Sequence, residues 1–230
     1  MKSCLISIRI VLFLLSFFYL GNQISAQIKS FVYQGIQVSS AQKSIDWDVL
    51  TEDKNIKLVY VKASDGAELR DLYYAENMAG AKRIGLNAGS CHLFTASPVA
   101  DQFANFIECT DSLQQDLVPL IEVDKSSFHN PYWQDSLQSF VDQIEARIGR
   151  KPMICIDNDC YNEHLSYRFR NHPLMICCQG GQKPQLKDQG NYLLWRFSEK
   201  GIVRGIKRPV SLSRFNSTAS LTDLLIRKNE

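Results

Sequence analysis

Short apolar runs and longer helical patterns alternate along most of this chain. The short runs are rich in β-branched and aromatic residues and predict seven strands: Phe31–Val38, Lys57–Lys62, Leu86–Phe94, Leu117–Asp124, Pro152–Ile156, Pro173–Cys178 and Tyr192–Phe197. Apolar residues recur at helical spacing within Asp71–Ile84, Pro98–Ser112 and Tyr132–Ile148. Gly85 and Gly149 follow two of these stretches, at the position where a glycine commonly ends a helix.

This alternation predicts βαβ units and a mainly parallel sheet. The predicted strands are almost continuously apolar, which is expected when helices or other strands cover both faces. Seven or eight strands in about 190 residues suit a small closed barrel better than a doubly wound sheet, and periodicity alone does not decide between the two. We therefore expect an α/β fold, a single irregular (β/α) TIM-like barrel. The segment from Ser213 to Glu230 is expected to be a final turn and a short polar tail.

The first 26 residues differ in character from the rest. Lys2 and Arg9 precede the almost wholly apolar run Ile10–Leu20, and small residues follow up to Ala26. This order predicts a signal peptide at residues 1–26, cleaved after Ala26, although an uncleaved anchor helix stays open. Residues 27–230 would then be one exported domain (periplasmic, surface-held or secreted) with no membrane span.

Charge does not point to nucleic acid or to an anionic membrane. The whole chain has 26 Lys and Arg against 24 Asp and Glu, and residues 1–26 contain two of the cations and none of the acids. The predicted mature chain is therefore neutral, whereas nucleic-acid-binding domains usually carry a basic surface.

Six cysteines remain after residue 26, and export makes disulfides chemically accessible. They are Cys91, Cys109, Cys155, Cys160, Cys177 and Cys178. Six cysteines allow fifteen complete pairings, so the sequence does not choose among them. Three of them lie in strongly apolar runs and also suit the interpretation of small core residues. Without a C-x-x-C pair or a His-rich cluster, we expect no metal site.

Two acids, Glu122 and Asp124, end the apolar run that starts at Leu117. Their i, i+2 spacing places both side chains on one face of a strand. In a parallel barrel the carboxyl ends of the strands carry the active site, and two neighbouring carboxylates can serve as acid and base. The same residues also fit a solvated strand end. Lys62, His92 and Arg196 interrupt apolar runs at corresponding positions.

The ordered motifs resemble glycoside hydrolase family 25, the lysozymes of the Chalaropsis type, from Tyr33 to Phe215. The matching segments are Gly35–Ser39, Ser44–Trp47, Val61–Gly66, Cys91–Phe94, Pro119–Asp124, Gly149–Ile154, Leu194–Phe197, Gly201–Ile206 and Pro209–Phe215. Each is weak alone, and their order and spacing together make the resemblance specific.

The resemblance implies an irregular β/α barrel that cleaves the β-1,4 bond between N-acetylmuramic acid and N-acetylglucosamine in peptidoglycan, without a cofactor. It implies that Asp124 and Glu122 are the catalytic pair, with Asp124 at the position of the general acid. By position, six further side chains are expected to contact the substrate: Gln37, Lys62, His92, Trp195, Arg196 and Ser211. The sequence identifies no protein partner.

The acidic positions depart from the family pattern. Gln37 and Ser211 replace two aspartates, and the D-x-E pair is exchanged to Glu122-Val-Asp124. Losing two negative charges weakens stabilisation of an oxocarbenium-like transition state. Asp124 is also one methylene shorter than the family's glutamate.

Three interpretations therefore follow from the sequence. The first is a lysozyme-like hydrolase of weakened or lost activity. The second is a non-catalytic module that binds peptidoglycan or a protein. The third is an interaction protein without glycan affinity, which the retained Lys62, His92 and Trp195 oppose. A fold alone does not decide among them.

Overall fold

A computed structural model describes residues 32–110, 114–180 and 182–226 of the chain. The predicted signal peptide, residues 1–26, lies outside the described residues. Within the described ranges, we find no helix with the length and apolar character needed to cross a membrane.

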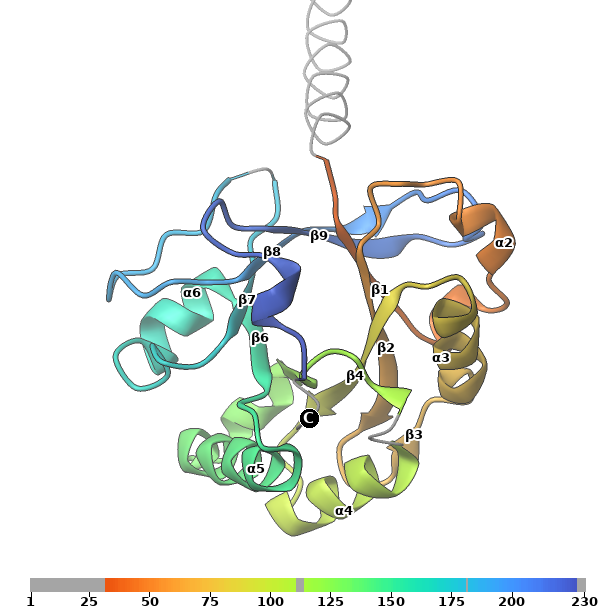
Figure 1. The fold of residues 1–230 in the computed structure, drawn as a ribbon. Helices are drawn as coiled ribbons and strands as arrows, with labels where there is room; N and C mark the ends of the chain where they lie inside the picture. The colour runs from red at the N-terminus through yellow and green to blue at the C-terminus, as the bar shows by residue number, and fades with distance from the viewer. Residues whose placement is uncertain (1–31, 111–113, 181, 227–230) are drawn as a thin grey trace, which may run out of the picture. The chain divides into compact units, whose positions relative to one another are not determined.

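The described residues contain eight strands that close into a barrel (Figure 1). They are β1 (Gly35–Val38), β2 (Leu58–Asp65), β4 (Asn87–Phe94), β5 (Leu120–Val123), β6 (Met153–Asp157), β7 (Leu174–Cys177), β8 (Leu194–Gly201) and β9 (Val210–Phe215). The short β3 (Leu69–Arg70) pairs with the end of β2. Pairing of β1 with both β2 and β9 closes the ring, which confirms the predicted barrel.

The barrel is parallel from β1 through β8, and β9 runs antiparallel to both of its neighbours. The expectation of a turn and tail from Ser213 onward is wrong at its start, because Ser213–Phe215 belong to β9. The alternation of Val210 and Leu212 with polar residues is the strand pattern that this expectation overlooked. Leu221–Asp223 then form a short 3-10 turn, η5.

Three long helices lie outside the ring: α3 (Tyr74–Arg83), α4 (Val99–Cys109) and α5 (Trp133–Ile148) (Figure 1). On α5, Leu137, Phe140, Val141 and Ile144 are buried, as their spacing predicts. Gly149 ends α5 with a φ of 74°, a conformation that glycine adopts without steric cost.

The other connections hold only short helical turns, which makes the barrel irregular. These turns are η1 (Ser40–Gln42) and α2 (Trp47–Leu50) between β1 and β2, and α6 (Asn158–Cys160) and η4 (Tyr161–Leu165) between β6 and β7. A further turn, η3 (Lys125–His129), precedes α5 in the β5–β6 connection. The described part of the β7–β8 connection contains no helix, because its glycines, Pro184 and polar residues give no apolar periodicity.

Alternate residues of the strands fill the barrel interior. The central cluster contains Leu58, Tyr60, Cys91, Leu120, Met153, Cys155, Met175 and Leu194. Two residues further along β2, β5 and β8 stand Lys62, Glu122 and Arg196, which the period of two turns to the same interior face. The interior is thus apolar in the middle and charged toward the carboxyl ends of these strands.

Candidate functional site

A pocket of about 380 Å³ opens at the carboxyl ends of β5 to β8. Its lining includes four carboxylates and two cations: Glu122, Asp124, Asp157, Glu199, Lys125 and Arg196. A shallower hollow of about 520 Å³ lies over α5 and shares no lining residue with it. The strand-end pocket therefore contains both members of the predicted carboxylate pair.

Glu122 is held by two partners inside the barrel. Arg196 Nη2 lies 2.7 Å from Glu122 Oε1, and Gln37 Nε2 donates a 2.7 Å hydrogen bond to Oε2. Arg196 Nη1 also donates to Gln37 Oε1 at 3.1 Å, so the three side chains form a closed network. The side chain of Arg196 is 9% exposed and that of Glu122 is 21% exposed.

This network sets the protonation state of Glu122. Burial raises the pKa of Glu122, but the charge and hydrogen bond of Arg196 and the hydrogen bond from Gln37 together hold that pKa below its ordinary value. Glu122 is therefore ionised at neutral pH, and its charge is largely cancelled by Arg196.

Asp124 follows β5 and is half-buried at the pocket. Its Oδ1 accepts a 2.8 Å hydrogen bond from the backbone N–H of Ser126, which caps the turn η3. Hydrogen bonds from Ser126 and the neighbouring backbone outweigh burial and lower the pKa of Asp124. In contrast to Glu122, Asp124 forms no ion pair among the described residues.

Two more of the predicted residues lie near this network. Lys62 is half-exposed, pairs with Asp65 at 2.9 Å, and lowers the pKa of both Glu122 and Asp124 through its charge. Ser211 pairs with Gln37 in the register of β1 and β9, so both side chains face the interior. The structure thus brings Gln37, Lys62, Arg196 and Ser211 to one region of the barrel.

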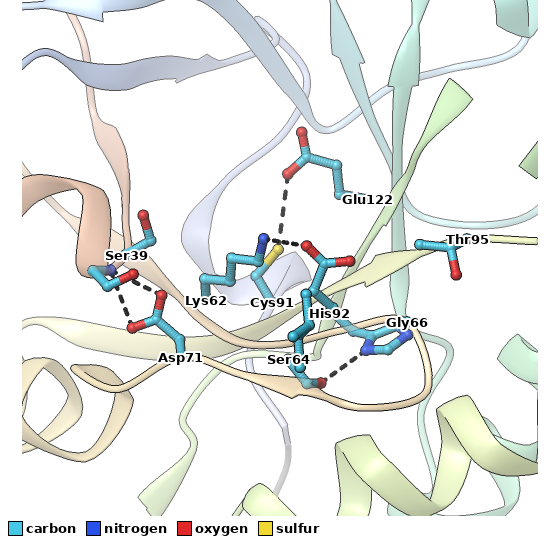
Figure 2. A network of polar contacts seen from close by, with 12 residues as sticks. Ser39, Lys62, Ser64, Gly66, Asp71, Cys91, His92, Thr95 and Glu122 are labelled. Carbon is cyan, nitrogen blue, oxygen red and sulfur yellow. Dashed lines mark hydrogen bonds and ion pairs between the residues drawn. The ribbon is translucent and has the colours of Figure 1, made fainter. Parts of the chain in front are cut away.

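His92 is placed elsewhere. It is fully buried on the outer face of β4, where its ring stacks on Phe140 of α5 with centroids 4.9 Å apart. Its Nδ1 lies 2.8 Å from Ser64 Oγ. Figure 2 draws this contact apart from the contact between Cys91 and Glu122. Burial lowers the pKa of His92 to about 4, so the ring is neutral.

Trp195 is also turned away from the pocket. It is 5% exposed, its Nε1 donates to the backbone oxygen of Cys178 at 2.9 Å, and its ring meets Phe197 edge-on. Cys91 and His92, like Trp195 and Arg196, are neighbours on a strand and must point to opposite faces. His92 and Trp195, which the sequence predicts to contact the substrate, therefore lie on the strand faces opposite to Cys91 and Arg196.

Two acids of the pocket, Asp157 and Glu199, were not among the residues predicted from the sequence. Asp157 stands two residues after the interior Cys155 and caps α6, because its side chain accepts hydrogen bonds from the backbone N–H groups of Asp159 and Cys160. The spacing of two along β6 places Asp157 on the same face as Cys155, so the sequence pattern does contain a signal for its position. Glu199 lies 3.4 Å from Arg196 but follows a register shift in β8, so simple alternation does not predict its position.

The six cysteines between residues 91 and 178 are free thiols in the structure. Three of them, Cys155, Cys160 and Cys177, line the pocket. Over the described ranges, no group of three or more His, Cys, Asp or Glu side chains is arranged to hold a metal ion.

Comparison with known protein families decides the assignment. The family model described as glycosyl hydrolases family 25 matches residues 36–206. The chain belongs to this family. The match begins inside β1 and ends after β8, so it includes the strands that supply Glu122 and Arg196 to the pocket.

Relatives of this family 25 chain include proteins with and without an assigned activity. The uncharacterized protein YegX of Escherichia coli is 28% identical over 183 residues, which cover 77% of this chain and 67% of that protein. An autolytic lysozyme of Clostridium acetobutylicum is 25% identical over 180 residues. This chain spans 54% of the clostridial protein's length.

Solved structures of the family share the fold. A family 25 glycosyl hydrolase from Bacillus anthracis superimposes with a TM-score of 0.71 at 24% identity, covering 81% of this chain and 91% of that one. A bacterial lysozyme from Streptomyces coelicolor gives 0.73 at 22% identity, covering 85% and 96%. The irregular barrel is therefore the family 25 fold.

Proposed function

We propose that this chain acts on peptidoglycan as a lysozyme-like glycoside hydrolase, cleaving the β-1,4 bond between N-acetylmuramic acid and N-acetylglucosamine. The observation that carries the proposal is the joint presence of Glu122 and Asp124 in one pocket at the strand ends of a family 25 barrel. The autolytic lysozyme of Clostridium acetobutylicum, which is similar over most of this chain, supports the same reaction.

Asp124 takes the role of proton donor in this proposal. Glycoside hydrolysis needs a protonated acid at the leaving oxygen and a second carboxylate near the anomeric carbon. Glu122 cannot donate at neutral pH because Arg196 keeps it ionised. Asp124 faces the pocket and is paired with no cation of the described residues, so it is the carboxyl that the substrate would meet.

Four interior side chains would bind the glycan around these acids: Gln37, Lys62, Arg196 and Ser211. Gln37, Arg196 and Lys62 supply hydrogen-bond donors, which suit the hydroxyl, acetamido and carboxylate groups of this polymer. We also propose that residues 1–26 direct export and that residues 27–230 form the mature domain, because peptidoglycan lies outside the cytoplasm.

The network around Glu122 predicts slow catalysis. Arg196 and Gln37 bind both oxygens of the Glu122 carboxylate, which would otherwise stabilise positive charge at the anomeric carbon. The pKa of Asp124 is lowered, so little of the acid is protonated at neutral pH. Both effects leave the binding surface intact while reducing the rate of the chemical step.

The same observation favours a second candidate function, peptidoglycan binding without cleavage. If neither carboxyl donates a proton at working pH, the pocket retains only its glycan contacts. Both candidate functions have peptidoglycan as the ligand, and only the hydrolase releases a cleaved product.

The test uses purified residues 27–230 and insoluble peptidoglycan, with sedimentation for binding and a reducing-end assay for cleavage. The hydrolase predicts both saturable binding and a slow, enzyme-dependent increase in reducing ends. Binding without new reducing ends would select the second candidate, and the absence of both would reject the two together.

A further inference from the structure

Two cysteines meet at the base of the pocket. Cys155 on β6 and Cys177 on β7 place their sulfur atoms 3.3 Å apart. The register pairs Cys155 with Met175 and Asp157 with Cys177, so the two thiols lie diagonally across neighbouring parallel strands. Both line the pocket, and Cys177 is the more accessible, with 8% exposure against 0% for Cys155.

This contact distinguishes the two residues from the other cysteines. Over the described residues, no second pair of sulfur atoms lies within hydrogen-bond distance. Cys160 lines the same pocket and Cys178 is the chain neighbour of Cys177, yet neither has a sulfur contact in the described part of the chain. Two buried sulfurs already in contact need to approach by only about 1.3 Å to reach the length of a disulfide bond, roughly 2.05 Å.

We propose that Cys155 and Cys177 are a redox-active dithiol that forms a disulfide across the base of the pocket. The oxidant is a small external disulfide, R–S–S–R. Cys177 attacks it as the thiolate, forms a mixed disulfide and releases one RSH. Cys155 then attacks the Cys177 sulfur, closes the intramolecular bond and releases the second RSH. The two thiols lose two electrons and two protons, and R–S–S–R gains them.

The order of attack follows from access. Cys177 reaches the pocket, whereas the hydrogen bond with Cys177 and complete burial raise the pKa of Cys155 well above its ordinary value. Cys155 therefore suits the resolving thiol, which reacts only after its partner has been activated. The positive charge of Arg196 lies close enough to favour the thiolate of Cys155 at that stage.

The bond would tie β6 to β7 where the pocket begins. It closes a loop that starts at Cys155, passes through α6 and η4, and ends at Cys177. A cross-link over a loop of this size restricts the unfolded chain, and we expect it to raise Tm by roughly 5–10 °C. The inference does not depend on whether the pocket cleaves glycan.

The test compares residues 27–230 after treatment with oxidised glutathione and after complete reduction. Trypsin leaves Cys155 and Cys160 on one peptide, Lys151–Arg168, and Cys177 and Cys178 on another, Asn171–Lys187. Mapping is therefore done in the Cys160→Ser/Cys178→Ser variant, in which each peptide keeps a single cysteine. Alkylation of the remaining thiols counts the free groups in the same samples.

The proposal predicts that oxidation joins these two peptides in the double variant, with a mass lower by two hydrogens, and raises Tm as stated. The linked peptides should disappear in a further Cys155→Ser variant. Wild-type protein, oxidised and reduced, gives the thermal shift without any substitution, so poor folding of a variant leaves the test intact. Unlinked peptides after oxidation, or a link that needs Cys160 or Cys178, would overturn the assignment.

Discussion

At the scale of single residues, the balance between burial and pairing at Glu122 controls the chemistry of the pocket. Burial alone would raise the pKa of Glu122, and Arg196 with Gln37 reverses that direction. A buried ion pair contributes little net stability compared with apolar residues, but removing one partner leaves an uncompensated charge.

Replacement of Arg196 by glutamine should raise the pKa of Glu122 above the ordinary value of 4.5, because burial then dominates. The free energy of unfolding should fall by about 3 kcal/mol at neutral pH, since a buried carboxylate loses its partner. Carboxyl titration by NMR and urea unfolding measure the two effects. Arg204→Gln is the matched control, because its pair with Glu52 is exposed and should contribute less than about 1 kcal/mol. An unchanged Glu122 titration would contradict the account.

Replacing Gln37 by aspartate, the residue of the family pattern, tests the role of Gln37 in the network with Glu122 and Arg196. In the variant Gln37→Asp/Arg196→Gln, a second carboxylate replaces the amide beside Glu122 and the cation is gone. The two negative charges would stabilise the positive charge that develops at the anomeric carbon, while Asp124 remains the proton donor. We expect reducing-end release from peptidoglycan to increase by roughly tenfold over wild type. A rate equal to or below that of Arg196→Gln alone would refute this interpretation.

At the scale of elements, strand alternation decides which side chains reach the pocket. On β4, Cys91 points into the barrel, and His92 packs between the sheet and the rings of Phe106 and Phe140. The residues predicted from the sequence to share one groove come from both faces of such strands. Side chains alternate between the two faces of a strand, so this alternation separates inward from outward residues once Glu122 is known to point inward.

The buried, neutral His92 should make stability depend on pH. Its pKa falls from 6.5 to about 4 on folding, so the unfolded chain binds more protons between these values. The contribution is present above pH 6.5 and is lost as the pH falls toward 4, by about 3 kcal/mol in total. Urea unfolding at several pH values, compared with His92→Gln, measures it. The variant should lose part of the pH dependence in that window; identical slopes would exclude His92 as the cause.

At the scale of the whole molecule, the sequence predicted the barrel because its strands and long helices have strong apolar patterns. The seven strands and three helices appear near their predicted positions, with ends shifted by a few residues. Strand β9 was missed because only Val210, Leu212 and Phe215 carry its pattern among polar residues. The Arg196–Glu122 pair could not be predicted, because it joins β8 to β5 across the barrel and depends on side-chain reach.

Whether this family 25 pocket hydrolyses glycan through Asp124 is tested most directly by reducing-end release from peptidoglycan as a function of pH. The comparison includes wild type, Asp124→Asn and Asp157→Asn, because both aspartates line the pocket and cap a short helical turn. An amide can still accept the capping hydrogen bond, so both variants should fold. We predict that the wild-type rate rises as the pH falls from 7 toward about 4, since more Asp124 is then protonated. Asp157→Asn should follow the wild type and Asp124→Asn should release no reducing ends, whereas undiminished release by Asp124→Asn would contradict the account.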